Sequence, residues 1–226
     1  MSRISAYCRV IFIGIIISTA ILSGEGAGRF PFQWSSYTTY FETGIEREKN
    51  IYLAAEKLDG FILHPGSEFS FNETVTWQIP RDEFGFAPAM VDGNLLPAQG
   101  GGLCQASSTL YAAALFAGFT ITERKSHSNP VRYISPGLDA TVSSPEKIDL
   151  KFRNDYKTPF IIKAHAKNGA LKIVFFSGTP LKNSITISTS APARDGEYIS
   201  LMTIRKTVSG EGISSTEILS TDRYTR

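Results

Sequence analysis

The segment Gly100-Gly-Gly-Leu-Cys-Gln-Ala-Ser-Ser-Thr-Leu-Tyr-Ala-Ala-Ala-Leu-Phe-Ala117 decides how this chain of 226 residues folds. Three glycines lead into a run rich in alanine and leucine, and Gly118 follows where helices commonly end. On a helix over about 104–117, apolar side chains would cover most of the circumference, so we expect this helix to be buried. Cys104 would then stand in its first turn.

Periodic patterns on both sides of this segment predict the rest of the architecture. Apolar residues at i, i+3, i+4 and i+7 indicate an earlier helix over about 47–58. After Gly118 the period changes to two, which is typical of strands with one buried face. We expect an α+β fold in which a buried central helix, with Cys104 at its N-terminus, packs on an antiparallel β-sheet. The strands expected there are 119–123, 131–134, 147–153 and a hairpin of 160–166 with 171–176 that turns at Asn168-Gly169.

The remaining segments complete three expected regions. An extended aromatic-rich stretch over 29–44 and a long ordered loop over 78–100, with a short hairpin near 90–96, belong to a main domain of residues 29–178. Residues 179–226 hold fewer large apolar side chains, and we expect them to form a small β-rich appendage. Its expected strands are 184–188, 198–204 and a last one near 216–219.

The N-terminus predicts export from the cytoplasm. Arg3 and Arg9 precede a thirteen-residue apolar run from Val10 to Leu22, and small residues follow. This is the pattern of a signal peptide, and the run is short for a transmembrane span, which needs roughly 20 apolar residues. We expect residues 1–28 to be a signal peptide or an N-terminal anchor, and the protein to act in the cell envelope. Without them Cys104 is the only cysteine, so no internal disulfide can form.

Composition narrows the functional classes. Hydrophobic residues make up 42% and charged residues 19%, which is ordinary for a folded protein, and the formal net charge is only +2. No basic tract stands out, so we expect no nucleic-acid partner. Any contact with a membrane is expected only through a retained N-terminal segment.

Cys104 is the strongest candidate for chemistry. Unpaired N–H groups at a helix start favour a thiolate, which is the nucleophilic form of cysteine. The N–H groups of Gly100, Gly101 and Gly102, with that of Cys104, could form an oxyanion hole. On the same helix face lie Ser107, Ser108 and Tyr111. The alternative is a small hydrophobe in the core, since a lone cysteine is often buried as one.

A cysteine nucleophile usually needs a histidine and a group that orients it. His64 lies in a predicted turn, and His165 lies on the predicted solvent-exposed face of a strand. His127 is therefore the candidate base. Asp139 is the candidate third member. A simple hairpin turn over 135–138 would, however, pair Asp139 with Ile134 and leave His127 roughly 20 Å away. Asp149, Glu146 or a backbone carbonyl are alternatives for orienting His127.

The segment 100–111 closely resembles the signature of the VanW family, which is named from a vancomycin-resistance gene cluster. The resemblance covers about residues 37–178, with further blocks in the same order. These blocks are 50–60, 65–72, 123–124, 127–128, 130–131, Tyr133, 136–137, 139–142 and 148–152.

This resemblance implies a bacterial cell-envelope protein whose partners are peptidoglycan stem peptides. Some relatives with this domain are understood to be L,D-transpeptidases, which form 3-3 cross-links through a cysteine thioester and use no metal or organic cofactor. Cys104 would attack, and His127 would act as base and then acid. Arg124 and Arg132 could bind stem carboxylates, although structural salt bridges explain them equally well. The full set of expected substrate contacts is Gly101, Gly102, Gln105, Ser107, Ser108, Tyr111, Arg124, Arg132 and Tyr133.

Two other functions remain open at this level. The thioester could pass to water, which would make the protein a cysteine amidase or endopeptidase of peptidoglycan. Alternatively, the domain could bind stems without turning them over, as a cell-wall or vancomycin-resistance accessory module.

Overall fold

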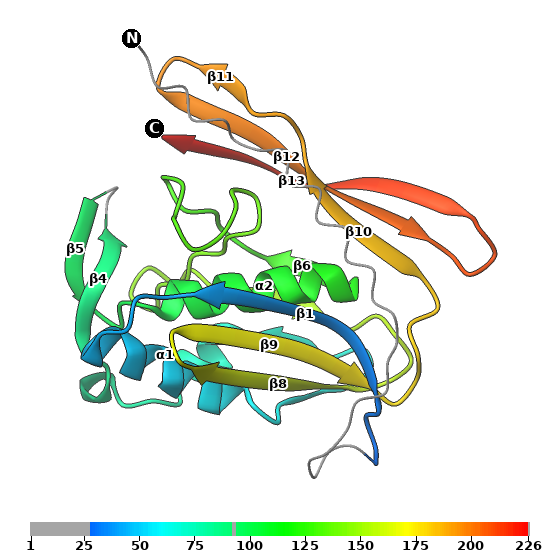
Figure 1. Ribbon diagram of the computed structural model, residues 1–226, viewed down its shortest axis with the longest axis horizontal. Coiled ribbons are helices and arrows are strands. Elements are labelled where there is room, and N and C mark those ends of the chain that lie inside the picture. The colour runs from blue at the N-terminus through cyan, green and yellow to red at the C-terminus, as the bar shows by residue number, and fades with distance from the viewer. Residues whose placement is uncertain (1–27, 92–93, 226) are drawn as a thin grey trace.

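A computed structural model describes residues 28–91 and 94–225 (Figure 1). The predicted signal peptide or anchor lies outside the described residues, except for Gly28. In the described part of the chain no helix is long and apolar enough to span a membrane. The elements, in chain order, are β1 (Phe32–Tyr40), α1 (Ile45–Leu58), β2 (Ile62–Leu63), β3 (Glu68–Ser70), η1 (Asn72–Thr76), η2 (Arg81–Glu83), β4 (Phe86–Val91), β5 (Asn94–Gln99), α2 (Leu103–Ala117), β6 (Thr120–Glu123), β7 (Lys151–Arg153), β8 (Phe160–Lys167), β9 (Ala170–Ser177), β10 (Ser184–Thr189), β11 (Ala193–Asp195), β12 (Tyr198–Val208) and β13 (Ser214–Thr225).

All pairings between these strands are antiparallel, which confirms the α+β class. The central sheet has the order β1-β9-β8-β2, and a short sheet has the order β3-β7-β6. The β4–β5 hairpin stands apart, and the C-terminal sheet has the order β10-β12-β11 with β13 paired to β12. The predicted turn at Asn168-Gly169 joins β8 to β9, and both residues have the positive φ that such a tight turn requires.

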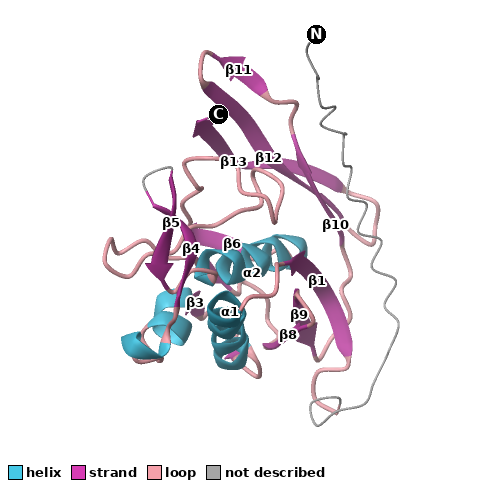
Figure 2. Cartoon of the chain, turned by 60° about the vertical axis from the view of Figure 1, so that its left-hand side comes forward, coloured by secondary structure: helices cyan, strands magenta, loops and turns pink. Residues whose placement is uncertain are grey.

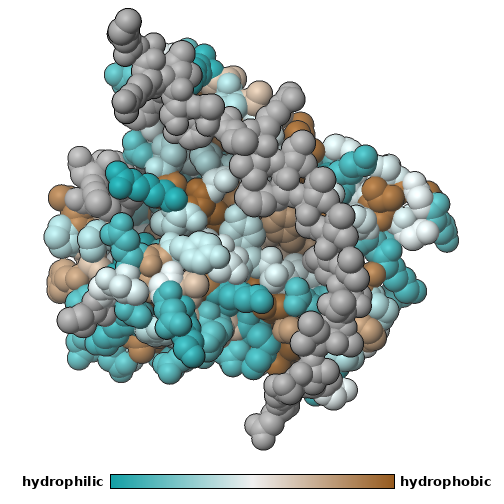
Figure 3. Space-filling view, in the orientation of Figure 1, coloured by the Kyte–Doolittle hydropathy of each residue, from teal (hydrophilic) through white to brown (hydrophobic). Residues whose placement is uncertain are grey.

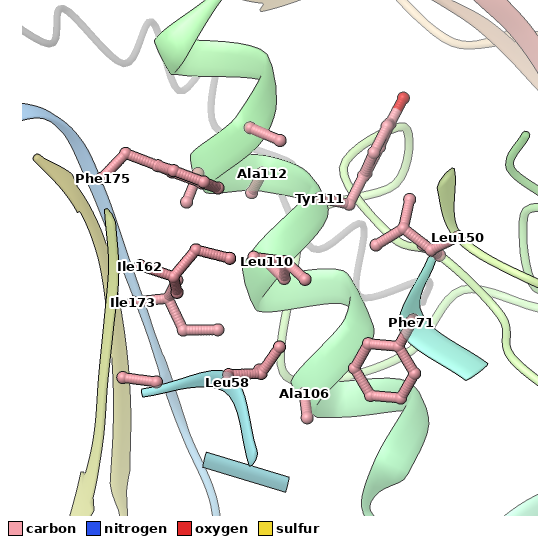
Figure 4. Packing of buried hydrophobic residues seen from close by; sticks show 14 of the residues in the cluster. Leu58, Phe71, Ala106, Leu110, Tyr111, Ala112, Leu150, Ile162, Ile173 and Phe175 are labelled. Carbon is pink, nitrogen blue, oxygen red and sulfur yellow. The ribbon is translucent and has the colours of Figure 1, made fainter. Parts of the chain in front are cut away.

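Helix α2 is the buried centre of the molecule, as predicted. From Gln105 to Ala117 every residue is buried, and the helix ends at Gly118, whose φ is +81°. Figure 4 shows Leu110 between two layers, with Ile162 and Ile173 of the central sheet on one side and Phe71, at the start of η1, and Leu150 on the other. Helix α1 packs beside α2 and covers β8 (Figure 2). Burial of apolar area on nearly every face holds the first turn of α2 in place.

The segment after β6 differs from the prediction. No strand forms over 131–134, and the predicted strand over 147–153 is reduced to β7. A turn does form over 135–138, where the Leu138 N–H donates to the Ser135 oxygen at 3.1 Å, but no paired strands flank it, so it is not the hairpin that would place Asp139 opposite Ile134. Instead the chain leaves β6 and returns through an antiparallel bridge between Lys125 and Thr141, where the Thr141 N–H donates to the Lys125 oxygen at 2.8 Å. In that register Asp139 lies opposite His127.

The C-terminal segment forms the β-rich region that was expected, and part of it packs against the main core. The predicted strands over 184–188, 198–204 and 216–219 are present, and β12 and β13 form a long hairpin. Figures 1 and 2 place this sheet on one side of α2 and the central sheet on the other. Ile185 and Ile187 of β10 belong to the main core, and Tyr224 of β13 is fully buried. The far end of the β12–β13 hairpin projects with apolar surface (Figure 3), in keeping with the exposure of Ile213 and Ile218.

Candidate active site

Cys104 is the second residue of α2 and lies half-buried at the wall of a cavity of about 730 Å³. Its Sγ is 3.5 Å from the backbone oxygen of Val142. The alternative of a thiol sealed in the core does not fit this position, because Cys104 is only half-buried and lines the cavity. A substrate in the cavity can therefore reach it.

The glycines before Cys104 serve the packing of the helix start. The N–H groups of Gly100 and Gly101 donate to backbone carbonyls at the base of the β4–β5 hairpin, so they are not available to an oxyanion, contrary to the prediction. A Cβ on Gly101 would lie 2.3 Å from the Ala87 oxygen, and Gly102 has a φ of +114°. Among the described residues no carbonyl accepts the N–H of Gly102 or that of Cys104, so these two groups remain candidates for an oxyanion hole.

His127 is brought to Cys104 by the loop that follows β6. Its ring Nδ1 and its own backbone N–H both lie 2.7 Å from Oδ2 of Asp139. The opposite nitrogen, Nε2, is 3.3 Å from the hydroxyl of Tyr133. Burial opposes the charged imidazolium, but the hydrogen bond with Asp139 and the nearby Cys104 side chain together raise the His127 pKa to about 9. The ring is thus prepared to carry a proton beside the sulfur.

Asp139 holds the ring of His127. The sequence suggested Asp139 for this role, although a simple hairpin over 135–138 would have kept the two residues apart. Asp139 is 1% exposed and accepts four hydrogen bonds. Two come from His127, one from Arg124 Nη2 at 3.2 Å, and one from the Tyr224 hydroxyl at 2.6 Å. Burial alone would raise its pKa, but His127 and Arg124 lower it to about 2. The carboxylate is therefore ionised and fixed.

The alternatives for orienting His127 lie elsewhere. Asp149 accepts from Ser70 Oγ at 2.5 Å and from the Asn72 N–H at 2.9 Å, and so fixes the loop after β3. Glu146 is exposed on the cavity wall. His64 and His165 are both exposed, as expected of solvated side chains.

Arg124 lies behind Asp139 and away from the cavity. Its Nε donates to the Asp139 backbone oxygen at 2.7 Å, its Nη1 pairs with Asp222, and its guanidinium lies 5.1 Å from the Tyr111 ring centre. The side chain is 6% exposed. Arg124 therefore does not line the cavity, where a stem carboxylate would have to bind. Tyr111 is buried beside it, and burial raises its pKa to about 12.

The two serines of α2 support the loop that carries Asp139. Ser107 Oγ donates to the Ala140 oxygen at 2.6 Å, and Ser108 Oγ accepts from the Ala140 N–H at 2.9 Å. Both are fully buried. They hold the residue next to Asp139 instead of facing the cavity.

The remaining residues that were predicted to contact substrate lie in different surroundings. Gln105 is buried, and its side chain joins Arg47 of α1 to β1, through bonds of 2.8 Å to Arg47 Nη2 and 2.9 Å to the Tyr40 oxygen. Tyr133 touches His127, and burial raises its pKa well above the ordinary value. Arg132 is exposed and does not line the cavity. Gly101 and Gly102 are buried.

Residues that the sequence reasoning missed form the cavity wall and the back of the site. Trp77, which is 61% exposed, lines the cavity with Arg81 and Lys125. Asp222 and Tyr224 reach the site from β13. The available signal was the alternation in Asp222-Arg-Tyr224, which places two polar-tipped residues on one strand face. In the described residues no group of three metal-ligating side chains occurs.

Comparison with known proteins places this chain in a family. A protein-family model described as "VanW like protein" matches residues 46–176. The chain is 37% identical over 163 residues to a protein of Bacillus subtilis (strain 168) named "Uncharacterized protein YoaR", with 72% of this chain and 54% of that protein covered.

A second relative is "Vancomycin B-type resistance protein VanW" of Enterococcus faecalis (strain ATCC 700802 / V583). It is 33% identical over 132 residues, which are 53% of this chain and 46% of that protein. The chain therefore spans about half the length of the curated relatives it matches. No solved structure matches it significantly.

Proposed function

This chain belongs to the VanW-like family, and we propose that it is a cysteine acyltransferase of the L,D-transpeptidase type that acts on peptidoglycan stem peptides. One observation carries the proposal. Cys104 stands at a helix start on the wall of an open cavity, beside a His127 that Asp139 holds through Nδ1. In this arrangement Cys104 would be the nucleophile, His127 the base and Asp139 the carboxylate that orients the base, which are the three groups that covalent acyl transfer uses.

The proposed reaction balances as two acyl transfers. The Cys104 thiolate attacks the carbonyl that precedes a terminal D-Ala, and a C–S bond forms as the C–N bond breaks. The leaving amine takes the proton of the His127 imidazolium. The side-chain amine of a diaminopimelate in a second stem then attacks the thioester, gives its proton to His127, and forms a new C–N bond as the C–S bond breaks. The N–H of Cys104 would stabilise the oxyanion in both steps.

The cavity suits a peptide with free carboxylates. Its volume of about 730 Å³ lies within the range of roughly 300–1,000 Å³ that is typical of ligand sites. Arg81 and Lys125 place cationic groups on its wall. Thr76 and Thr141 also line it, and their buried hydroxyls have no hydrogen-bond partner in the described part of the chain. Arg81 and Lys125 replace Arg124 and Arg132 as the proposed contacts for stem carboxylates.

The proposed substrate sets the place of action. Peptidoglycan lies outside the cytoplasm, so we propose an extracytoplasmic protein that is exported through its N-terminal segment. Stem peptides would be its partners.

The deciding experiment is an analysis of muropeptides from a host that lacks other L,D-transpeptidases and expresses wild-type or Cys104→Ala protein. We expect 3-3 cross-linked dimers with the wild type and none with Cys104→Ala. Shortened monomers that depend on Cys104 would replace the proposal with an amidase or endopeptidase. An unchanged profile, with both proteins present in the envelope, would overturn both enzyme functions and favour a binding module.

A further inference from the structure

Strand β13 ends directly behind the site, outside the part of the chain that matches the family model. Asp222 and Tyr224 lie on the same face of the strand because they are two residues apart. Tyr224 is 0% exposed, and its hydroxyl donates to Asp139 Oδ1 at 2.6 Å and accepts the Gly137 N–H at 2.7 Å. One phenol thus fixes both the carboxylate and the turn that carries it.

Asp222 acts on the same carboxylate through Arg124. It is 6% exposed, pairs with Arg124 Nη1, and accepts from Ser220 Oγ at 2.9 Å. Arg124 therefore lies between two carboxylates, Asp139 and Asp222. Without Asp222 the buried guanidinium would have only Asp139 as an anionic partner, and its charge would compete more strongly with His127 for that carboxylate.

The last residue of β13 also holds the chain around His127. The Thr225 N–H donates to the Ser128 oxygen at 2.7 Å, and Asn129 Nδ2 donates to the Thr225 oxygen at 3.2 Å. β13 thus contacts the segment that follows His127 and the loop that carries Asp139. β13 therefore contacts both of the chain segments, one carrying His127 and one carrying Asp139, that the bridge between Lys125 and Thr141 brings together.

We propose that Asp222 and Tyr224 are positioning residues of the Cys104 site, which β13 completes by holding Asp139 in the geometry that orients His127. The inference deepens the proposed function and rests on it in one respect, namely that Cys104 acts together with His127. The C-terminal sheet is then part of the active site. A merely structural sheet would affect stability and leave the state of His127 unchanged.

The test follows His127 and Cys104 directly in the full-length protein. The chain has three histidines, so an NMR titration of the imidazole signals resolves the midpoint of His127 in each variant. The charged and titratable groups around this ring are Cys104 of α2, Arg47 of α1, Tyr133, Lys125, Asp139 and Arg124, together with Asp222 and Tyr224. The rate of Cys104 alkylation by iodoacetamide at pH 7 supplies a second readout that needs no peptidoglycan.

We expect Asp222→Asn to lower the His127 midpoint by about one pH unit and the alkylation rate about three- to tenfold, because a buried anion is lost. Tyr224→Phe is expected to slow alkylation by about threefold or more, because Asp139 loses one of its donors. Asp195→Asn and Tyr198→Phe are matched controls. They make the same chemical changes on exposed residues of the same sheet and are expected to match the wild type.

Variants that lose thermal stability but keep both the wild-type midpoint and the wild-type alkylation rate would overturn the inference. If Asp222→Asn does not fold, the alkylation rate of Tyr224→Phe decides. An unchanged muropeptide profile with Cys104→Ala would refute the proposed reaction alone, since neither readout here depends on transfer to a stem peptide.

Discussion

The ring Nδ1 of His127 lies 2.7 Å from Oδ2 of Asp139, and the same oxygen accepts the backbone N–H of His127. Twelve residues separate the two in sequence. Their meeting depends on the bridge between Lys125 and Thr141, which closes a wide loop where a simple hairpin would have kept them apart. Because one carboxylate fixes both the ring and the chain that carries it, Asp139 sets the direction of Nε2, which lies 3.3 Å from the Tyr133 hydroxyl.

The first prediction concerns this carboxylate. Asp139→Asn should lower the turnover of the proposed reaction by roughly 10²–10⁴, since an amide in that place favours the wrong tautomer of His127 and leaves its cation uncompensated. The measurement is the rate of thioester-dependent transfer with purified stem peptides, at a temperature where circular dichroism shows the variant to be folded. Asp59→Asn removes an exposed carboxylate and should leave the rate unchanged. A folded Asp139→Asn variant with wild-type turnover would contradict the assignment.

The second prediction is a pH dependence of stability. The folded-state pKa of His127 is about 9, above the ordinary 6.5, so its contribution is fully present below pH 6.5 and is lost as pH rises through about 9. At roughly 1.4 kcal/mol for each pH unit, this contribution is about 3 kcal/mol. Urea unfolding of wild type and His127→Gln at pH 6 and pH 9.5 measures it. We expect the difference in unfolding free energy between the two proteins to shrink at pH 9.5.

Asp139 acts in the opposite pH range. Its pKa is lowered to about 2 from the ordinary 3.8, so its contribution is present above pH 3.8 and is lost as pH falls through about 2. The site should therefore stabilise the fold most between about pH 4 and pH 6.5. For the second prediction, the contradicting outcome concerns His127. A difference in unfolding free energy between wild type and His127→Gln that grows above pH 8 would show that the imidazolium is not the favoured form.

The sequence predicted the elements whose pattern is local and strong. The all-round apolar stretch after Cys104 required a buried helix, and the positive-φ residues Asn168 and Gly169 fixed the β8–β9 hairpin. Cys104 and His127 followed from chemistry that depends on residue type. What could not be predicted was the path between them, because the loop over 128–138 is fixed by contacts with the distant residues Thr225 and Tyr224.

The same limit applies to the cavity and to the basic residues. Arg124 has a side chain suited to a stem carboxylate, but its partners Asp139 and Asp222 are 15 and 98 residues away, and no local pattern reports them. Ser107 and Ser108 were correctly placed on the Cys104 side of α2, yet a loop covers them. Only the fold decides which members of a helix face meet solvent.

The third prediction concerns the wall of the cavity. Trp77 is exposed, lines the same cavity as Cys104, and donates from Nε1 to Ser144 Oγ at 3.0 Å. Trp77→Ala should raise the KM for the stem peptide, with a loss of roughly tenfold in kcat/KM if the ring packs on substrate. Alkylation of Cys104 by iodoacetamide should be unchanged. Phe86→Ala truncates another exposed ring, outside the cavity lining, and should leave KM unchanged.

The fourth prediction tests the glycines before Cys104. A Cβ at position 101 would lie 2.3 Å from the Ala87 oxygen, which is a backbone atom that cannot turn away. Gly101→Ala should therefore cost about 1–3 kcal/mol of unfolding free energy, as overpacking does in other cores. Gly210→Ala meets its nearest atom at 3.4 Å and should stay near wild type. Equal denaturation midpoints for the two variants would show that the glycines serve something other than this close approach.

The last prediction concerns the core that holds α2. Leu110 is fully buried between the central sheet and the residues Phe71 and Leu150 (Figure 4). Leu110→Ala leaves a cavity that neither layer can fill, because each is tied to its own sheet or loop, and it should cost about 3–5 kcal/mol in urea unfolding. Ile218→Ala truncates a side chain that is 60% exposed and should cost little. Cys104 lies six residues before Leu110 on the same helix. A Leu110→Ala protein that remains folded should keep its Cys104 alkylation rate, because the substitution alters neither the thiol nor His127 and Asp139.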